Sequence, residues 1–130
     1  MILGVGVDLA SVARFRALLA RRGGRAVRRL LAAEEAIAHA RARDPARDLA
    51  KRWAVKEAYA KALGTGLAGI AARDIALMRA ADSGAPGIRL STAGQAFAAA
   101  RGAGAAHISL SDEGDQVIAM VVVERASGVG

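Results

Sequence analysis

Three charged side chains stand out by their types and spacing. Asp8 directly follows Ile2 to Val7, a short apolar run that predicts a buried strand ending at this carboxylate. Glu57 and Lys61 are four residues apart on a predicted helix, so they share one face. Two carboxylates from separate elements can hold magnesium, which takes few protein oxygens and keeps waters and substrate phosphates. A neighbouring lysine would neutralise charge on a transferring phosphoryl group, so this set favours pyrophosphate chemistry.

Spacing alone also allows an ordinary structural interpretation. Asp8 could be a solvated aspartate at a turn or helix start, and Glu57 with Lys61 could be a surface ion pair contributing about 0.5 kcal/mol or less. His107 opens a predicted strand with Ser109 on the same polar face. We expect His39 to lie at the surface, and the two histidines are too isolated in sequence to predict a zinc site.

A glycine-rich segment follows the predicted helix. Residues 64–69 match G-x-G-x-x-G as a string, but the dinucleotide-binding fingerprint follows a strand and opens a helix. We therefore interpret Gly64, Thr65 and Gly66 as a helix stop. Their exposed backbone N–H groups could still form a nest that binds phosphate.

The elements that must position these residues follow from hydrophobic periodicity and caps. Ser11 is the expected cap of a first helix that Gly23 ends, and Asp48 is the expected cap of the helix that carries Glu57 and runs to about residue 63. Residues 117–124 are apolar on both faces and should form a central strand. One strand, several helices and then mostly strands predict a single α+β domain over residues 1–130. The remaining predicted elements are helical segments at 25–31 and 33–43, strands at 74–79, 88–90 and 107–111, and a helix from 92 to about 102.

Composition limits the function classes. Nineteen Lys and Arg against twelve Asp and Glu give a formal charge of +7, which attracts polyanions or an acidic protein. Aromatic residues make up 3% of the chain, too few to stack single-stranded nucleic acid. The longest apolar stretch, 117–123, is too short to span a membrane. Absence of cysteine excludes thiol catalysis, and without a basic leader at the N-terminus we expect a cytoplasmic protein.

Arginines are concentrated in the first helical region. They form either a solvated face or a surface that docks an acidic partner and raises its rate of association. The core is light in large side chains, so an oligomer interface could add apolar burial. The arginines of this region are Arg14, Arg21, Arg22, Arg25, Arg28 and Arg29.

Three segments together resemble the holo-acyl-carrier-protein synthase family, small bacterial 4′-phosphopantetheinyl transferases. Residues 2–9 (ILGVGVDL) are similar to its N-terminal G-x-G-x-D strand, and residues 51–66 (KRWAVKEAYAKALGTG) to its central signature. Residues 107–112 (HISLSD) are similar to its C-terminal strand. Trp53 replaces the commoner phenylalanine, Asp112 stands where some members have histidine, and Ala32 and Ala33 replace a polar helix cap.

The resemblance implies a fold, an activity and a set of site residues. The fold would be a small antiparallel sheet with packed helices, completed by trimerisation with active sites between subunits. The activity would be magnesium-dependent transfer of phosphopantetheine from coenzyme A to a serine of an acidic acyl carrier protein, in support of fatty-acid biosynthesis and without nucleic acid or membrane partners. The other product would be 3′,5′-adenosine bisphosphate.

The resemblance also assigns roles to individual residues. Asp8 and Glu57 would hold magnesium, and the base that activates the serine would be either Glu57 or a water held by the metal. Arg14 and Arg28 would dock the carrier. Contacts to coenzyme A would come from Arg52, Lys61, Gly64, Thr65, Gly66, Pro86, His107 and Ser109.

Two other classes of protein stay open on the sequence. The positive charge alone would also suit a nucleic-acid-binding module, whose retention on DNA or RNA would depend on salt. A structural protein with a surface Glu57–Lys61 pair is the other alternative. A thermal shift on addition of coenzyme A and magnesium would separate the structural alternative from the enzyme.

Overall fold

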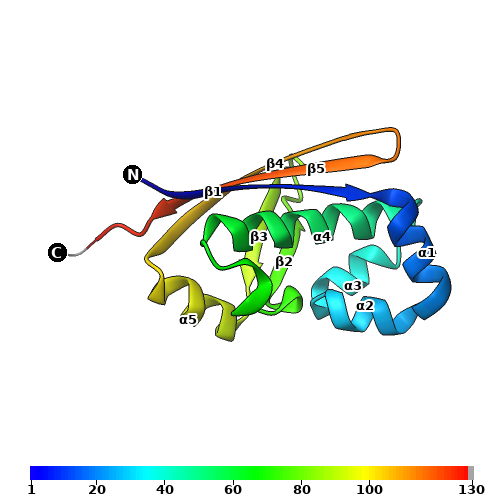
Figure 1. The fold of residues 1–130 in the computed structure, drawn as a ribbon, viewed down its shortest axis with the longest axis horizontal. Helices are drawn as coiled ribbons and strands as arrows, with labels where there is room; N and C mark the ends of the chain where they lie inside the picture. The colour runs from blue at the N-terminus through cyan, green and yellow to red at the C-terminus, as the bar shows by residue number, and fades with distance from the viewer. Residues whose placement is uncertain (129–130) are drawn as a thin grey trace.

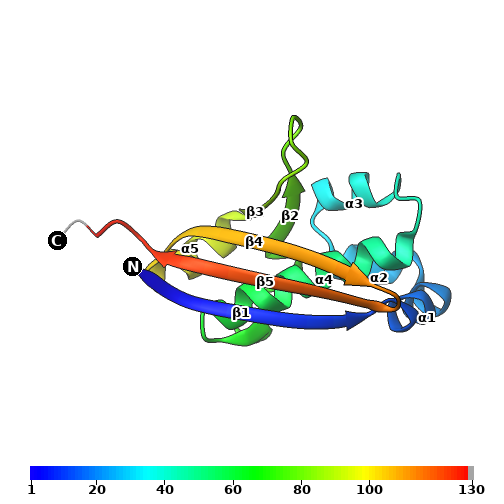
Figure 2. The same cartoon turned by 90° about the horizontal axis from the view of Figure 1, so that it is seen from above.

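The structure is a computed structural model that describes residues 1–128. Its long sheet has three antiparallel strands, β1 (Ile2–Ser11), β4 (Ala103–Glu113) and β5 (Gln116–Arg125), in the order β1-β5-β4. Figure 2 shows the three strands running side by side. The α+β class and the central place of the last strand are thereby confirmed. Alternate β5 side chains from Val117 to Val123 are fully buried, which explains why this apolar strand takes the middle position.

The central helix α4 (Pro45–Ala62) runs beneath the sheet, along β1 and β5 (Figure 1). Its cap is Asp44, whose carboxylate accepts a hydrogen bond from the Arg47 backbone N–H at 3.2 Å. The prediction that Asp48 caps this helix is wrong. Proline at the first helical position lacks an N–H and has a φ suited to a helix, so Pro45 lets the helix start four residues earlier.

Two glycines let β1 and α4 meet at backbone distance. A Cβ atom at Gly4 would lie 1.9 Å from the Ala62 carbonyl oxygen, and one at Gly6 would lie 1.8 Å from that of Ala58. No side chain fits at either position without moving the strand from the helix. Because β1 continues to Ser11, Asp8 lies inside the strand, not just after it as predicted.

Three short helices gather at one end of α4 (Figure 1): α1 (Val12–Arg22), α2 (Gly24–Leu30) and α3 (Ala33–His39). Ser11 caps α1 as predicted, since its Oγ accepts from the Arg14 N–H at 3.2 Å. The predicted stop at Gly23 is also confirmed, with φ of 49°. His39, expected at the surface, is buried. Its Nδ1 lies 2.7 Å from the Asp48 carboxylate, because α3 packs this end against α4.

A two-stranded hairpin, β2 (Ile75–Arg79) and β3 (Pro86–Leu90), stands out sideways from the long sheet in Figure 2. The helix α5 (Thr92–Ala100) follows it and leads into β4. Two short 3-10 helices, η1 (Gly66–Ala68) and η2 (Ala72–Asp74), join α4 to the hairpin. This connection places the glycine-rich segment directly after α4.

The long sheet has one covered face and one uncovered face. Its inner side packs on α4, while six large apolar side chains on the outer side are between 38% and 60% exposed. Among residues 1–128, no helix combines the length and apolar character needed to cross a membrane. The outer apolar residues are Ile2, Val5, Val7, Leu9, Ile118 and Met120.

Candidate active site between the first strand and the central helix

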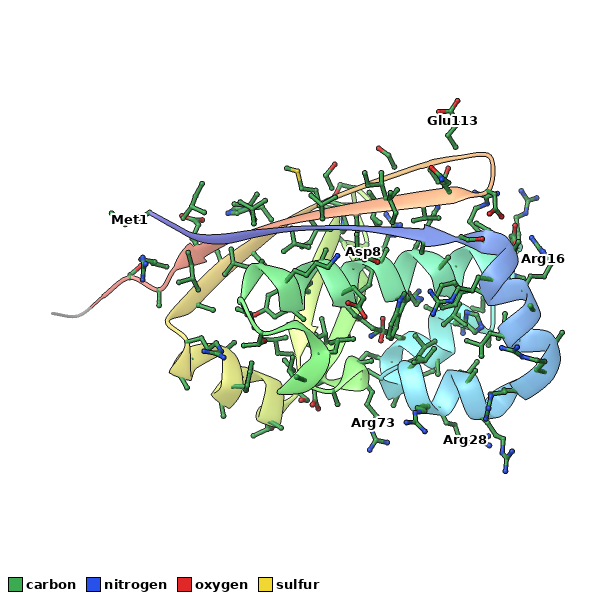
Figure 3. The ribbon with its side chains drawn as sticks, viewed as in Figure 1. Met1, Asp8, Arg16, Arg28, Arg73 and Glu113 are labelled. Carbon is green, nitrogen blue, oxygen red and sulfur yellow. The ribbon has the colours of Figure 1, made fainter. Side chains whose placement is uncertain are left out.

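Asp8 lies on the inner side of β1, in the same alternating row as Gly4 and Gly6. In Figure 3 its label lies between the strand and α4. The Lys61 Nζ donates to Asp8 Oδ1 at 3.2 Å and to the Val7 carbonyl oxygen at 3.1 Å. The Asp8 side chain is 15% exposed and that of Lys61 49%, so the lysine covers the carboxylate from the solvent side.

Glu57 lies one helical turn before Lys61 and is half-buried. Burial raises the pKa of its carboxyl above the ordinary value, and the negative charge of Asp8 raises this pKa further. The positive charges of Lys61 and Arg14 act in the opposite direction. The two carboxyl groups are therefore close enough to repel each other. The structure brings Asp8, Glu57 and Lys61 together, as the magnesium hypothesis requires.

The two carboxylates fit a hard cation with few protein ligands. In the described part of the chain, no group of three or more His, Cys, Asp or Glu side chains could hold a metal ion. Zinc sites usually need three or four such ligands. Magnesium instead keeps several waters and takes one or two carboxylates together with substrate phosphates. A bound divalent ion would also neutralise the repulsion between these two carboxylates.

The glycine-rich segment extends the site beyond the end of α4. Gly64 and Gly66 have φ of 83° and 61°, a conformation that glycine adopts without strain. Gly64 therefore ends the helix three residues after Lys61, which confirms the predicted helix stop. The Thr65 hydroxyl donates to the Gly66 carbonyl at 3.0 Å and so holds the turn together. Any contact of this segment with coenzyme A stays a prediction.

His107 and Ser109 lie on the other side of the sheet. His107 pairs with Val122 and Ser109 with Met120, so both side chains share the outer face with the exposed apolar residues. The His107 Nε2 lies 2.7 Å from the Glu124 carboxylate. Since Asp8 faces inward, one chain alone does not bring these two residues to Asp8 and Glu57.

Two other predicted ligand residues also lie away from the carboxylate pair. Pro86 opposes Arg79 in the projecting hairpin, and Arg79 lines a small polar pocket with Lys51 and Ser111. Arg52 is buried, and its guanidinium donates to Asp48 Oδ2 at 2.9 Å and to the Leu77 carbonyl oxygen at 2.8 Å. Their predicted contacts with coenzyme A stay predictions.

The two predicted docking arginines lie at different places. Arg14 is close enough to Glu57 to lower its pKa, and its guanidinium lies 5.8 Å from the centre of the Phe15 ring. Arg28 lines a groove of about 640 Å³ on the side of the molecule opposite the sheet, where Figure 3 labels Arg28 and Arg73. The groove combines four arginines with apolar side chains. They include Arg25, Arg28, Arg29, Arg73, Trp53 and Leu67.

A buried charged cluster that was not predicted from the sequence lies next to the site. Glu35 and Lys56 are both fully buried, and the Lys56 Nζ donates to Glu35 Oε1 at 2.5 Å. The sequence does contain a signal for the direction of Lys56: it directly precedes Glu57 on a helix, so the two side chains point about 100° apart. With Glu57 facing β1, Lys56 points about 100° away from it, toward Glu35 and Ile75.

Comparisons with known proteins identify the family. The model of the 4′-phosphopantetheinyl transferase superfamily matches residues 4–121. The holo-[acyl-carrier-protein] synthase of Thiobacillus denitrificans is 50% identical over 128 residues, covering 98% of this chain and 97% of that protein.

Solved structures show the same fold. The crystal structure of holo-[acyl-carrier-protein] synthase from Neisseria meningitidis has a TM-score of 0.90 and 36% identity, covering 96% of this chain and all of that one. The Helicobacter pylori enzyme, crystallised in complex with coenzyme A, has a TM-score of 0.81 and 27% identity, covering 92% and 99% of the two chains.

Proposed function

The chain belongs to the 4′-phosphopantetheinyl transferase superfamily, and from this premise we propose that it is a holo-[acyl-carrier-protein] synthase. It transfers the 4′-phosphopantetheine group of coenzyme A to a serine of apo acyl carrier protein and releases 3′,5′-adenosine bisphosphate. The observation that carries the proposal is the meeting of Asp8, Glu57 and Lys61 between β1 and α4. The similarity to proteins of this name over nearly the whole chain supports it.

The site residues divide the work by their charge. Asp8 and Glu57 would hold a magnesium ion, which supplies charge neutralisation for the pyrophosphate of coenzyme A. The Lys61 ammonium, anchored 3.1 Å from the Val7 carbonyl oxygen, contributes a positive charge beside the leaving phosphate. Because its pKa is raised, Glu57 is a better proton acceptor than an ordinary glutamate. Glu57 is thus one candidate base for the serine hydroxyl, and water is the other.

The arginine-lined groove supports docking of an acidic carrier. Trp53 lies in this groove and one turn before Glu57 on α4, so one helical turn separates a residue of the groove from the carboxylate. An acidic helix of the carrier that paired with Arg28 would lie near the reacting groups. Arg14, beside Glu57, would contact the carrier close to the serine.

We further propose that the enzyme is a homotrimer with its active site shared between subunits. Support comes from the uncovered apolar face of the sheet, since exposed patches of this kind mark interfaces. His107 and Ser109 lie on that face, so a neighbouring copy could receive them at its own Asp8 and Glu57. The magnesium requirement and the cytoplasmic location belong to the same proposal.

A mass measurement tests the function. The protein is incubated with coenzyme A, magnesium and an apo acyl carrier protein, and the carrier is weighed by mass spectrometry. We expect a gain of one phosphopantetheine, lost when EDTA removes the metal. Unchanged masses for several different carriers would refute the assignment.

Mixing two inactive variants tests the shared site. Glu57→Gln and His107→Ala each damage one half of a site that two chains form. If the site is shared, allowing subunits to exchange restores part of the activity, because some sites then combine an intact Glu57 with an intact His107. Activity that stays absent in mixtures whose exchange is verified would show that Glu57 and His107 of different chains do not form one site.

A further inference from the structure

Glu35 joins three elements through one fully buried carboxylate. Its Oε1 accepts from the Lys56 Nζ of α4 at 2.5 Å and from the Ala32 N–H before α3 at 3.0 Å. Its Oε2 accepts from the Leu77 N–H of β2 at 2.9 Å. Arg52, one turn before Lys56, adds a longer contact at 3.5 Å. Within residues 1–128, no buried side-chain nitrogen or oxygen lacks a partner.

The other partners of this cluster also belong to β2. Lys56 donates to the Ile75 carbonyl oxygen, and Arg52 donates to that of Leu77 at 2.8 Å. The side of α4 that faces α3 and β2 is thus fixed by directional hydrogen bonds. Glu57, the residue after Lys56, faces the opposite partner, β1.

The contact of α4 with β1 is made largely by small residues, and Lys61 adds hydrogen bonds to Val7 and Asp8 near one end of the helix. The buried residues at four-residue spacing along this helix are alanines, from Ala46 to Ala62. Against them β1 presents Gly4 and Gly6. Methyl groups against glycines allow close approach but make no directional bonds. The polar cluster supplies the directional restraint that these small side chains lack.

Stability alone is a weak reason for such a cluster. Replacing a buried ion pair by apolar side chains of similar volume is often neutral or stabilising. The magnesium ion proposed for Asp8 and Glu57, however, demands near-octahedral geometry. A displacement of about 1 Å at a catalytic centre can lower the rate about 100-fold. Because Lys56 directly precedes Glu57, a small displacement of Lys56 would also move the Glu57 carboxylate.

We propose that Glu35 and Lys56 are a positioning pair, which sets the rotation of α4 and thereby holds Glu57 and Lys61 at Asp8. Neither residue touches the substrate, and both act through the helix. The inference rests on the proposed transferase function. It predicts that the pair can be removed without unfolding the protein but not without displacing the metal-binding carboxylate.

The test is the double variant Glu35→Gln with Lys56→Met, which removes both charges and nearly keeps both shapes. Four quantities are compared with the parent protein: melting temperature, kcat, KM for the carrier, and the Kd of Mn²⁺ measured by electron paramagnetic resonance with coenzyme A present. We expect a folded protein with an unchanged KM but a lower melting temperature, because the single oxygen of Gln cannot accept from both the Ala32 and the Leu77 N–H groups. The rate kcat should fall about 100-fold, and Mn²⁺ should bind about tenfold more weakly.

Ile75→Val is the matched control, because it removes one methylene beside the cluster and leaves the ion pair intact. It should lower the melting temperature while kcat and the Kd of Mn²⁺ stay at parental values. A folded double variant with parental kcat and parental Mn²⁺ affinity would overturn the inference.

Should the double variant not fold, Lys56→Arg decides the question, because it keeps the charge but moves the donor atoms. The same loss of kcat and Mn²⁺ affinity is expected, and parental values would overturn the inference. Failure of the proposed function is recognised separately, because then the parent protein itself would transfer nothing to any carrier.

Discussion

At the scale of single residues, Glu57 combines function with a cost in stability. Its pKa is raised in the folded protein, chiefly by burial, so the folded state holds its proton to higher pH than the unfolded chain does. By linkage, the free energy of unfolding falls as the pH rises from the ordinary glutamate pKa through the raised one. At a pH above the raised pKa, the ionised Glu57 therefore destabilises the metal-free protein.

Glu57→Gln should separate these two effects. Without the charge, the melting temperature of the metal-free protein should rise at a pH above the raised Glu57 pKa, since the cost of burying the charge is gone. Transfer activity should fall about 100-fold or more, because a metal ligand and candidate base is lost. Thermal unfolding and a carrier assay measure both. Unchanged turnover would remove Glu57 from the site.

The pH dependence of metal binding is a second test of the raised pKa of Glu57. Divalent ions bind the ionised form of Glu57. Because its pKa is raised, acidification should weaken metal affinity already at a higher pH than it would with an ordinary glutamate. In Asp8→Asn the repulsion disappears, and the pKa of Glu57, followed by carboxyl ¹³C NMR, should fall. It should stay above the ordinary value, because burial remains. A pKa that does not move would mean that the two carboxyl groups do not interact.

At the scale of elements, the contact between β1 and α4 decides whether the site exists. Gly6→Ala would place a Cβ atom 1.8 Å from the Ala58 carbonyl oxygen and push the strand from the helix. We expect a loss of about 2 kcal/mol or more in the free energy of unfolding, measured with urea. Transfer should be lost too, since Asp8 moves with its strand.

Gly87→Ala is the control for this prediction, because a Cβ atom there meets nothing within 4 Å. Its free energy of unfolding should change by less than about 1 kcal/mol. Equal effects of the two substitutions would mean that close approach of β1 to α4 is not what the glycines provide.

At the scale of the whole molecule, the outer face of the sheet controls assembly. Met120 lies on the central strand β5 and is 44% exposed, so Met120→Glu places a charge within the apolar patch. Sedimentation should then show a monomer with little transfer activity. Ile37→Glu, at a position on α3 that is 62% exposed, should leave assembly and activity unchanged. A fully active monomer would argue against a site shared between chains.

The sequence by itself determined the α+β class, the central last strand and the helix stop at Gly64, and it predicted that Asp8, Glu57 and Lys61 would come together. Periodicity, turn residues and side-chain chemistry are local properties, so a linear pattern carries them. Roles drawn from family resemblance, the magnesium requirement, the trimer and the single domain over residues 1–130 stay predictions.

Only the tertiary structure decided what depends on packing between distant segments. The opposite sides of the sheet taken by Asp8 and His107 follow from strand register. The burial of His39 and the Glu35–Lys56 pair follow from α3 and β2 meeting α4. The physical reason is that a charged side chain has the same local pattern whether it faces water or a buried partner, and only the fold brings that partner to it.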